Sequence, residues 1–318
     1  MNLTRVAKTS AATIAHTFYL DETATDATGA VTYVVTDATG APAATGPATH
    51  GTTGVYSFVL PGQAALKALT VAWSGTLAGT AVTELDFVEI VGGHFFGLAE
   101  GRASDPTLAD TVKYPTADLI TARLEVEVEC EEICGRAFVP RYRRVVLDGN
   151  GTGELTLPDA DVRTIRSVTM APRTGGTFTA LTAGQLVALS VGADSMVRRE
   201  DGGVWTEGRD NVVVEYEFGL DAPPRDLARA AKTRLRSRLN AKSSGIPERA
   251  MSISVVDGMG TYQLSTPGAW RTGIPDVDAA YARYSLRDQE SEGGRAVPAS
   301  RLLNFDPQRN SLFHGGVR

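Results

Sequence analysis

The side chains of this sequence that could hold a metal ion or react covalently are four histidines and two cysteines. The histidines are scattered along the chain: His16, His50, His94 and His314. None has a second histidine four residues away, the spacing that places two zinc ligands on one helix face. Cys130 and Cys134 lie one turn apart on an expected helix, where their Cβ atoms would be about 6 Å apart, too far for a relaxed disulfide. We therefore predict no metal site and two reduced cysteines that pack in the core.

A second pattern of possible metal ligands resembles the template of a calcium-binding loop. Its members occupy positions 1, 3, 5, 6 and 12 of that template: Asp148, Asn150, Thr152, Gly153 and Asp159. Asp159 stands where the template has a bidentate glutamate, and the flanking sequence is typical of strands rather than helices. We predict that Asp148–Gly151 is a hairpin turn instead.

The sequence lacks the short motifs that mark common catalytic and nucleotide-binding sites. It has no Gly-x-Ser-x-Gly elbow, no phosphate-binding loop ending in Gly-Lys-Ser/Thr, and no Gly-x-Gly-x-x-Gly between a strand and a helix. We therefore predict that the protein is not an enzyme and needs no cofactor.

Charge and composition divide the 318 residues into unlike parts. Residues 1–100 hold three basic and eight acidic residues, a net charge of −5, although the whole chain carries only −6. Short β-type runs in this part are separated by turn residues at the spacing of an all-β sandwich. The predicted strands are Ala12–Leu20, Ala30–Thr36, Gly54–Leu60, Leu69–Leu77 and Thr83–Val91. We predict an immunoglobulin-like β-sandwich over residues 1–95, followed by a linker over residues 96–112.

The rest of the chain combines helix periodicity with further strand patterns. The predicted elements are helices over residues 116–135, 224–241 and 276–284, a β-rich insertion over residues 139–220, and a hairpin over Val255–Tyr262. Thr116 is expected as the N-cap of the first helix and Gly135 as its left-handed C-cap. The predicted fold class is thus α+β, with a helical core over residues 113–285 and an extended C-terminal tail over residues 286–318.

The two long helices carry opposite charge, and two interpretations remain open. Residues 117–135 hold six acidic residues and one basic residue, whereas residues 225–242 hold seven basic residues and one acidic residue. In the first interpretation, the helices pack along their apolar stripes and share flanking ion pairs, each of small value at a surface. In the second, one charged face meets a neighbouring subunit or lines a channel.

A further basic cluster, together with the basic helix over residues 224–241, could contact phosphate groups. The cluster consists of Arg136, Arg141, Arg143 and Arg144, with Tyr142 among them. The chain as a whole is negatively charged, and no series of interleaved aromatic residues accompanies the cluster. Sequence-specific nucleic-acid binding is therefore not favoured, and Trp73, Trp205 and Trp270 are expected to be core or interface anchors. We also expect no membrane insertion, because no apolar run approaches the roughly 20 residues that a spanning helix needs.

Four strings occur in one order between residues 110 and 285. They read EEICGRAF, LDGNGTGELTLP, FGLDAPPRDL and TGIPDVD, at Glu131–Phe138, Leu147–Pro158, Phe218–Leu227 and Thr272–Asp278. Together they resemble the head-to-tail adaptor, or head-tail connector, family of long-tailed double-stranded DNA phages. The N-terminal β-sandwich departs from the simplest members of that family.

This resemblance implies a structural virion protein without catalytic activity. It implies a homo-oligomeric ring, typically of twelve copies, that docks under the portal protein, meets a tail-side connector or tail terminator protein, and continues the channel for double-stranded DNA. It also implies a place in the neck of the virion, after assembly in the cytoplasm of the bacterial host. The competing interpretation, suggested by the first domain, is a carbohydrate-binding or adhesin-like β-sandwich protein of the phage particle.

Within this scheme, two sets of residues are candidates for function. Glu125, Glu129 and Glu132 share one face of the acidic helix, and we expect them either to line the channel or to pair with Arg229 and Arg236 of the basic helix. The apolar residues of the tail are expected to dock on a partner: Leu302, Leu303, Phe305, Leu312 and Phe313.

Overall fold

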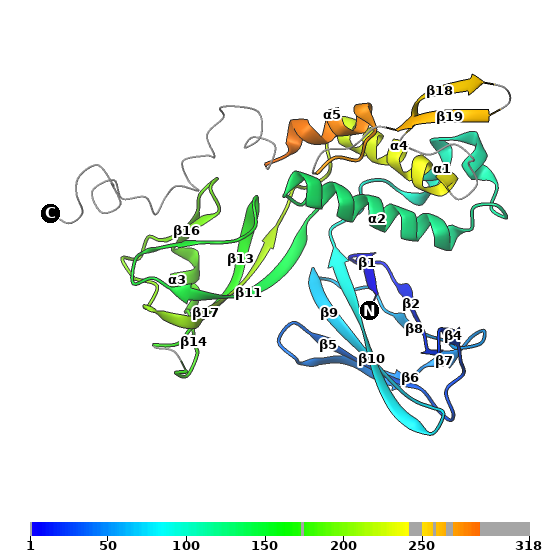
Figure 1. Ribbon diagram of the computed structural model, residues 1–318. Coiled ribbons are helices and arrows are strands. Elements are labelled where there is room, and N and C mark those ends of the chain that lie inside the picture. Colours follow the sequence, from blue (N-terminus) through cyan, green and yellow to red (C-terminus); the bar gives the residue numbers. More distant parts are fainter. Residues whose placement is uncertain (1, 173–174, 242–249, 257–258, 265–269, 287–318) are drawn as a thin grey trace, which may run out of the picture.

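The computed structural model describes residues 2–172, 175–241, 250–256, 259–264 and 270–286. It contains two β-rich regions and one layer of helices, so the chain is a mixture of helices and several sheets (Figure 1). The apolar residues predicted to anchor the tail lie outside the described residues: Leu302, Leu303, Phe305, Leu312 and Phe313.

The N-terminal region is built from two main sheets. The larger has the strand order β1-β10-β9-β5-β6, with β1 parallel to β10, and the smaller has the order β2-β8-β7. Its strands are β1 (Leu3–Ala7), β2 (Ala12–Thr17), β3 (Tyr19–Leu20), β4 (Thr23–Ala24), β5 (Thr32–Asp37), β6 (Pro42–Pro47), β7 (Thr49–His50), β8 (Val55–Leu60), β9 (Lys67–Leu77) and β10 (Thr80–Val91). Because side chains alternate along a strand, Tyr56 and Phe58 of β8 meet Val71 and Trp73 of β9 in one buried core.

Two edge strands of the larger sheet are absent from the sequence prediction. β6 contains two prolines and small residues, which fit an edge strand but give a weak strand signal. β1 holds Arg5 at its centre, a residue type that is rarely buried unless it is paired. The immunoglobulin-like topology assigned to this region stays a prediction.

The helix layer contains α1 (Leu98–Ala103), the 3₁₀ turn η1 (Pro106–Ala109), α2 (Thr116–Cys134), α4 (Arg225–Ala241) and α5 (Pro275–Tyr284). Its core includes Leu119 and Val126 of α2 together with Leu227 and Leu235 of α4. The prediction of a linker over residues 96–112 is wrong. That segment forms α1 and η1, because Phe96 and Leu108 are buried in the same core as the long helices.

Of the two capping residues predicted for α2, the N-cap is wrong and the C-cap is confirmed. Pro115, rather than Thr116, occupies the N-cap position, and no side chain caps this end. Gly135 adopts φ 68° and ψ 22° at the other end, the left-handed conformation that glycine takes at low cost.

The β-rich insertion forms two small sheets, with orders β11-β17-β13-β14 and β12-β16-β15. Its elements are β11 (Arg141–Gly149), β12 (Glu154–Thr156), β13 (Val162–Met170), β14 (Thr179–Ala180), α3 (Ala183–Val187), β15 (Leu189–Val191), β16 (Met196–Arg199) and β17 (Gly208–Phe218). The predicted hairpin at Asp148–Gly151 is wrong, because β11 pairs with β17 and β12 pairs with β16. The turn instead carries the chain from one sheet to the other.

The last two strands, β18 (Ala250–Val256) and β19 (Met259–Leu264), pair antiparallel, as expected of the hairpin predicted over Val255–Tyr262. The two residues between these strands, 257–258, lie outside the described part of the chain.

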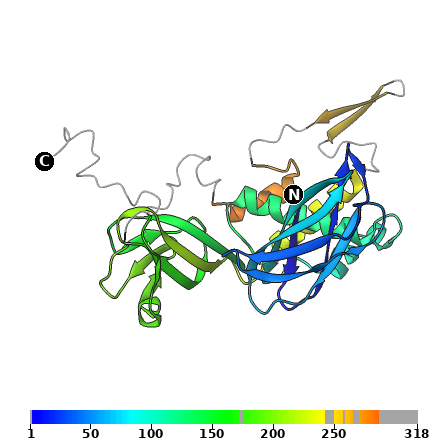
Figure 2. The ribbon, with the colours of Figure 1, turned by 90° about the horizontal axis from the view of Figure 1, so that it is seen from below.

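The helix layer lies at the junction of the two β-rich regions. In Figure 1, α2 runs between the N-terminal strands on one side and α4 and α5 on the other. Seen from below, the N-terminal sheets (blue) and the insertion (green) lie side by side (Figure 2), and contacts join β9 and β10 to β11. Helix α2 therefore has one side toward the N-terminal strands and another toward α4.

Candidate functional site: the charged faces of the helix layer

Helices α2 and α4 are joined by ion pairs along one seam. Glu129 accepts two hydrogen bonds from Arg234, at 2.9 Å from Nε and 3.0 Å from Nη2. Arg238 bridges the same glutamate and the next turn, with 2.8 Å to Glu125 and 3.2 Å to Glu129. The oppositely charged helices are thus partners within one chain, as the first interpretation of the sequence holds.

The predicted basic partners, Arg229 and Arg236, are wrong. Arg229 is exposed, and Arg236 lies 3.6 Å from Asp105 at the start of η1. The reason is the rotational position of each residue on α4. The apolar residues of α4 in the shared core include Leu227 and Ala231, and Arg234 follows them by seven and three residues, so it falls on their side of the helix.

The seam keeps its carboxylate charged. Burial disfavours the charged form of Glu129, but the hydrogen bonds and charges of Arg234 and Arg238 outweigh burial and lower the pKa of Glu129 below its ordinary value. The Arg234 side chain is only 10% exposed, whereas that of Glu125 is 50% exposed. The inner ion pair is therefore better shielded from water and salt than the outer one.

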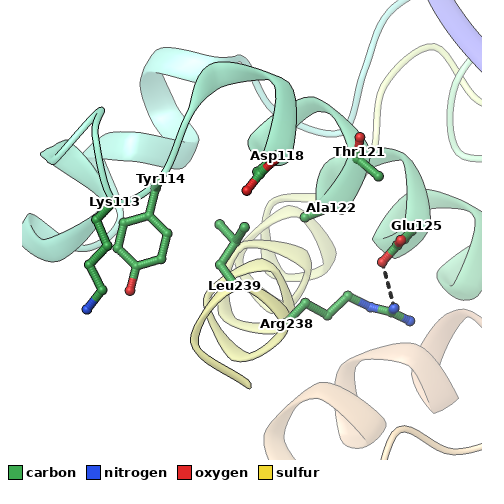
Figure 3. Close-up of a pocket in the computed structure, with 8 residues that line it drawn as sticks. All are labelled: Lys113, Tyr114, Asp118, Thr121, Ala122, Glu125, Arg238 and Leu239. Carbon is green, nitrogen blue, oxygen red and sulfur yellow. Dashed lines mark hydrogen bonds and ion pairs between the residues drawn. The ribbon is translucent and has the colours of Figure 1, made fainter. Parts of the chain in front are cut away.

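A hollow of about 260 Å³ opens beside the outer end of this seam. Figure 3 shows the Glu125–Arg238 ion pair on one side of it and Lys113 and Tyr114 on the other. Asp118 adds a carboxylate to the lining. In residues 2–172, 175–241 and 270–286, no group of three or more His, Cys, Asp or Glu side chains could hold a metal ion.

Glu132 takes no part in the seam. It is exposed and lines a separate groove of about 350 Å³ near the C-terminal end of α2. The three glutamates that the sequence placed on one face are therefore divided. Glu125 and Glu129 pair with α4, and Glu132 faces the groove.

A buried ionic cluster, which the sequence analysis missed, joins α2 to the N-terminal strands. It consists of Arg5, Glu89, Glu127, Glu131 and Arg141, from β1, β10, α2 and β11. Arg5 lies 2.5 Å from Glu131, 3.1 Å from Glu89 and 3.5 Å from Glu127. Arg141 donates to Glu89 at 2.6 Å and to Glu131 at 2.9 Å. Three regions of the chain are thus held together at one point.

Three members of this buried cluster, Arg5, Glu127 and Glu131, have pKa values shifted from their ordinary values. Burial lowers the pKa of Arg5, but the carboxylates of Glu131 and Glu89 outweigh it and raise the pKa above the ordinary value. Burial raises the pKa of Glu131. Burial also tends to raise the pKa of Glu127. The nearby His94 ring and the Phe95 amide, which donates at 2.9 Å, outweigh burial and lower the pKa of that carboxyl.

The arginine cluster around residue 140 offers little free charge to phosphate groups. Each of its members has a carboxylate partner: Arg136 with Asp161, Arg141 with Glu89, Arg143 with Asp159, and Arg144 with Glu215. Asp159, the last position of the calcium template, also accepts a hydrogen bond from the Tyr216 hydroxyl. Its carboxylate is therefore used in packing the insertion.

The remaining sequence candidates are mostly core residues. Cys130 and Cys134 are buried and free. His16 is buried against Asp86, with 2.7 Å between Nδ1 and the carboxylate. Trp73 and Trp205 are fully buried, as expected of core anchors, whereas Trp270 is 51% exposed, so the core role is excluded for it and the interface role stays a prediction. No helix within the described ranges is long and apolar enough to cross a membrane.

Three of the four strings that carry the family resemblance meet at the C-terminal end of α2. The Leu220 amide donates to the Ala137 carbonyl at 3.3 Å. Gly219 has φ +94°, and a Cβ there would lie 2.3 Å from the Val139 carbonyl oxygen, so a side chain does not fit. Val277 of the fourth string is buried in the same core cluster as Cys134 and Phe138 of the first. Tyr281, further along α5, accepts a hydrogen bond from the Cys134 thiol through its carbonyl, at 3.5 Å.

The second and fourth strings also have definite structural roles. Leu155 and Leu157 of the second string are buried in the core of the insertion. In the fourth, the Asp278 carboxylate accepts hydrogen bonds from the Thr272 amide at 2.7 Å and the Gly273 amide at 3.0 Å, which fixes the turn before α5.

Comparison with known proteins gives matches among solved structures alone. No protein-family model and no curated protein matches the chain. One match is a chain from the neck of an empty gene transfer agent (GTA) particle computed with C6 symmetry. It is 18% identical, the match covers 60% of the present chain and 89% of the GTA chain, and the TM-score is 0.39. The corresponding values are 14%, 62%, 94% and 0.37 for the neck of the native GTA particle computed with C12 symmetry. They are 17%, 60%, 89% and 0.41 for the virion of the native GTA particle. At these TM-scores the likeness by itself supports no functional conclusion.

Proposed function

We propose that this chain is a structural protein of the neck of a phage-like particle, and that it acts as a head-to-tail adaptor. It would form a homo-oligomeric ring under the portal protein, typically of twelve copies, and join the DNA-filled head to the tail-side connector. The observation that carries the proposal is the convergence of three family-like strings at the C-terminal end of α2. Strings that are far apart in the sequence contact one another there and join the end of α2 to the segment before α4 and to α5.

A closed ring requires each copy to present two different surfaces that fit one another. The sequence suggested the acidic and basic helices as these two surfaces. Because Glu125 and Glu129 are already paired with Arg234 and Arg238 of the same chain, we propose that other surfaces form the sides of the ring. The charged seam then serves to hold each subunit in one shape.

The proposed role of the C-terminal segment is attachment to a partner. The described chain ends at Leu286, whose amide donates to the Cys134 carbonyl at 2.8 Å. Residues 287–318 follow Leu286 in the sequence. We propose that Leu302, Leu303 and Phe305 in this segment dock on the portal, a neighbouring copy or the tail-side ring.

The decisive experiment is electron microscopy of particles assembled without this protein. We expect DNA-filled heads that lack tails, and we expect the wild-type gene supplied in trans to restore tailed particles. Normal tailed particles in its absence would refute the proposed function. Glycan binding by a small, non-assembling chain would favour the carbohydrate-binding alternative instead.

A truncated chain ending at Leu286 tests the proposed role of the tail. We expect it to fold, as judged by circular dichroism, and to fail to join heads to tails. Efficient joining by the truncated chain would show that residues 287–318 are not the docking segment.

A further inference from the structure

Helix α4 carries a row of basic residues on the side opposite to α2. We define the α4 stripe as Arg225, Arg229, Lys232 and Arg236. These positions follow the spacing i, i+4, i+7 and i+11, which places them within an arc of about 60° on an α-helix. Arg225, Arg229 and Arg236 are exposed, and Lys232 is half-buried. The stripe is therefore one continuous surface of the helix layer.

The other side of α4 is fully committed to packing. Leu227, Ala231 and Leu235 are completely buried against the helix layer. Arg234 and Arg238 are turned toward the glutamates of α2. The residues of α4 that pack in the core and the residues of the stripe therefore lie on opposite sides of the helix. The stripe is the side of α4 that the described fold leaves exposed.

The charge of the stripe is nearly uncompensated within the described chain. Arg236 has a carboxylate at 3.6 Å, that of Asp105. In the parts of the chain whose side chains the structure describes, no carboxylate lies within ion-pair distance of Arg225, Arg229 or Lys232. The arginine cluster around residue 140 differs in this respect, because each of its members is paired.

The spacing of the stripe suits a regular polyanion. A rise of 1.5 Å per residue spreads its four cations over about 16 Å, which equals the rise of roughly five base pairs along the axis of a DNA duplex. Lys and Arg contacts to phosphate carry no sequence information. The acidic face of α2 on a second copy is a less suitable partner. On α2, Glu125 is already paired, and Asp118 and Glu132, both exposed, are separated by about 21 Å.

We propose that the α4 stripe binds the phosphate backbone of double-stranded DNA without reading its sequence. The inference rests on the proposed function for the presence of DNA beside the ring, and it deepens that function by assigning the DNA-facing surface. The surface is the basic side of α4 rather than the acidic face of α2. Such contacts would hold DNA in the channel by charge alone and would weaken as salt is added.

The test is the salt dependence of DNA binding by the full chain, measured by fluorescence anisotropy with fluorescein-labelled duplexes of two unrelated sequences. Four phosphate contacts per engaged subunit predict a slope of log K against log salt of about −3.6, or about 150-fold weaker binding between 50 and 200 mM salt. In the variant R225Q/R229Q/K232Q/R236Q we expect this contribution to disappear, equally for both sequences. The variant R225K/R229K/R236K should keep it, because phosphate accepts either cation.

A matched control removes the same number of positive charges, four, from exposed positions outside the stripe: K8Q/K113Q/R209Q/R271Q. We expect this control to retain most of the wild-type slope. An equal loss in the control, or an unchanged slope in the stripe variant, would overturn the inference, as would undetectable binding by the wild type. Loss of ring assembly in the stripe variant alone, with DNA affinity retained, would overturn it in favour of an acidic surface on a second copy.

These outcomes are separate from the fate of the proposed function. Particles that assemble normally without the chain would refute the adaptor role, but the salt slope would still show whether the stripe binds DNA. Conversely, tailless particles together with an unchanged slope would support the adaptor role and reject the stripe as its DNA-facing surface.

Discussion

The two charged sides of α2 make similar ion pairs in very different surroundings. Toward the N-terminal strands, Glu127 and Glu131 are buried and share Arg5. Toward α4, Glu125 and Glu129 pair with Arg238 and Arg234 at the edge of the layer. Removing one partner of a buried pair leaves an uncompensated charge in a medium that solvates it poorly, and costs about 3–5 kcal/mol, whereas an exposed pair contributes about 0–1 kcal/mol.

The acidic residues of α2 therefore have two structural roles. The buried glutamates join the helix to a different region of the chain, and the outer ones align it with its neighbour in the same layer. We therefore expect substitutions on the two sides to differ in the size of their effect and in its dependence on salt.

The largest effect is expected from Arg5→Met. This change leaves the carboxylates of Glu89, Glu127 and Glu131 close together with Arg141 as the one remaining arginine of the cluster. We expect the free energy of unfolding to fall by about 3–5 kcal/mol in urea titrations. Lys8→Met, at an exposed position directly after the end of β1, is the control. A loss below about 1 kcal/mol for Arg5→Met would remove the distinction between the two sides.

The next largest effect is expected from Arg234→Gln, which breaks the two hydrogen bonds to Glu129 at the inner seam. Because hydrogen bonds to charged groups contribute about 1.5–3 kcal/mol, we expect a loss in that range. Arg236→Gln, on the far side of α4, is the matched control and should change the unfolding free energy little. Equal losses for the two variants would mean that the seam adds no stability.

The pH dependence of stability sharpens the comparison further. The pKa of Glu129 is lower in the folded chain than its ordinary value of about 4.3. Its contribution is therefore complete above that value and is lost as the pH falls through the folded-state pKa. Glu129→Gln should flatten the fall in stability below about pH 5 in urea midpoints measured at a series of pH values. Parallel profiles for wild type and variant would contradict a charged seam.

The smallest effect is expected from Glu125→Gln. The outer ion pair is half exposed, so we expect a loss below about 1 kcal/mol that shrinks further in high salt. A double-mutant cycle with Arg238→Gln isolates the pair from the second contact of Arg238 with Glu129. A coupling energy as large as the stability loss expected for Arg5→Met would show that the exposure of an ion pair does not set its contribution to stability on the two sides of α2.

Much of the helix layer follows from local sequence. The period of apolar residues and Gly135 as a C-cap predict a helix over residues 116–135, and α2 runs from Thr116 to Cys134. The same reasoning fails for α1 and η1, which are too short to show a periodic pattern. Their formation depends on the burial of Phe96 and Leu108 against helices that follow later in the chain.

The candidate site could be predicted in part. The apolar positions Leu227, Ala231 and Leu235 contain the signal that places Arg234 on the α2 side, and attention to the phase of the helix would have found it. No comparable signal identifies the partner of Glu131. Arg5 is 126 residues away, and its own strand gave no clear pattern.

Three features can be predicted from the sequence alone: the order of the β-rich and helical parts, the opposite charges of α2 and α4, and the resemblance of four strings to the adaptor family. Periodicity, composition and motifs are properties of neighbouring residues, so they need no tertiary contacts. Tertiary structure alone decided which charges are used. It buries Glu127 and Glu131 beside Arg5, pairs two further glutamates with α4, and leaves the α4 stripe uncovered. The physical reason is that the cost of a charge depends on its distance from water and from other charges, and packing sets both distances.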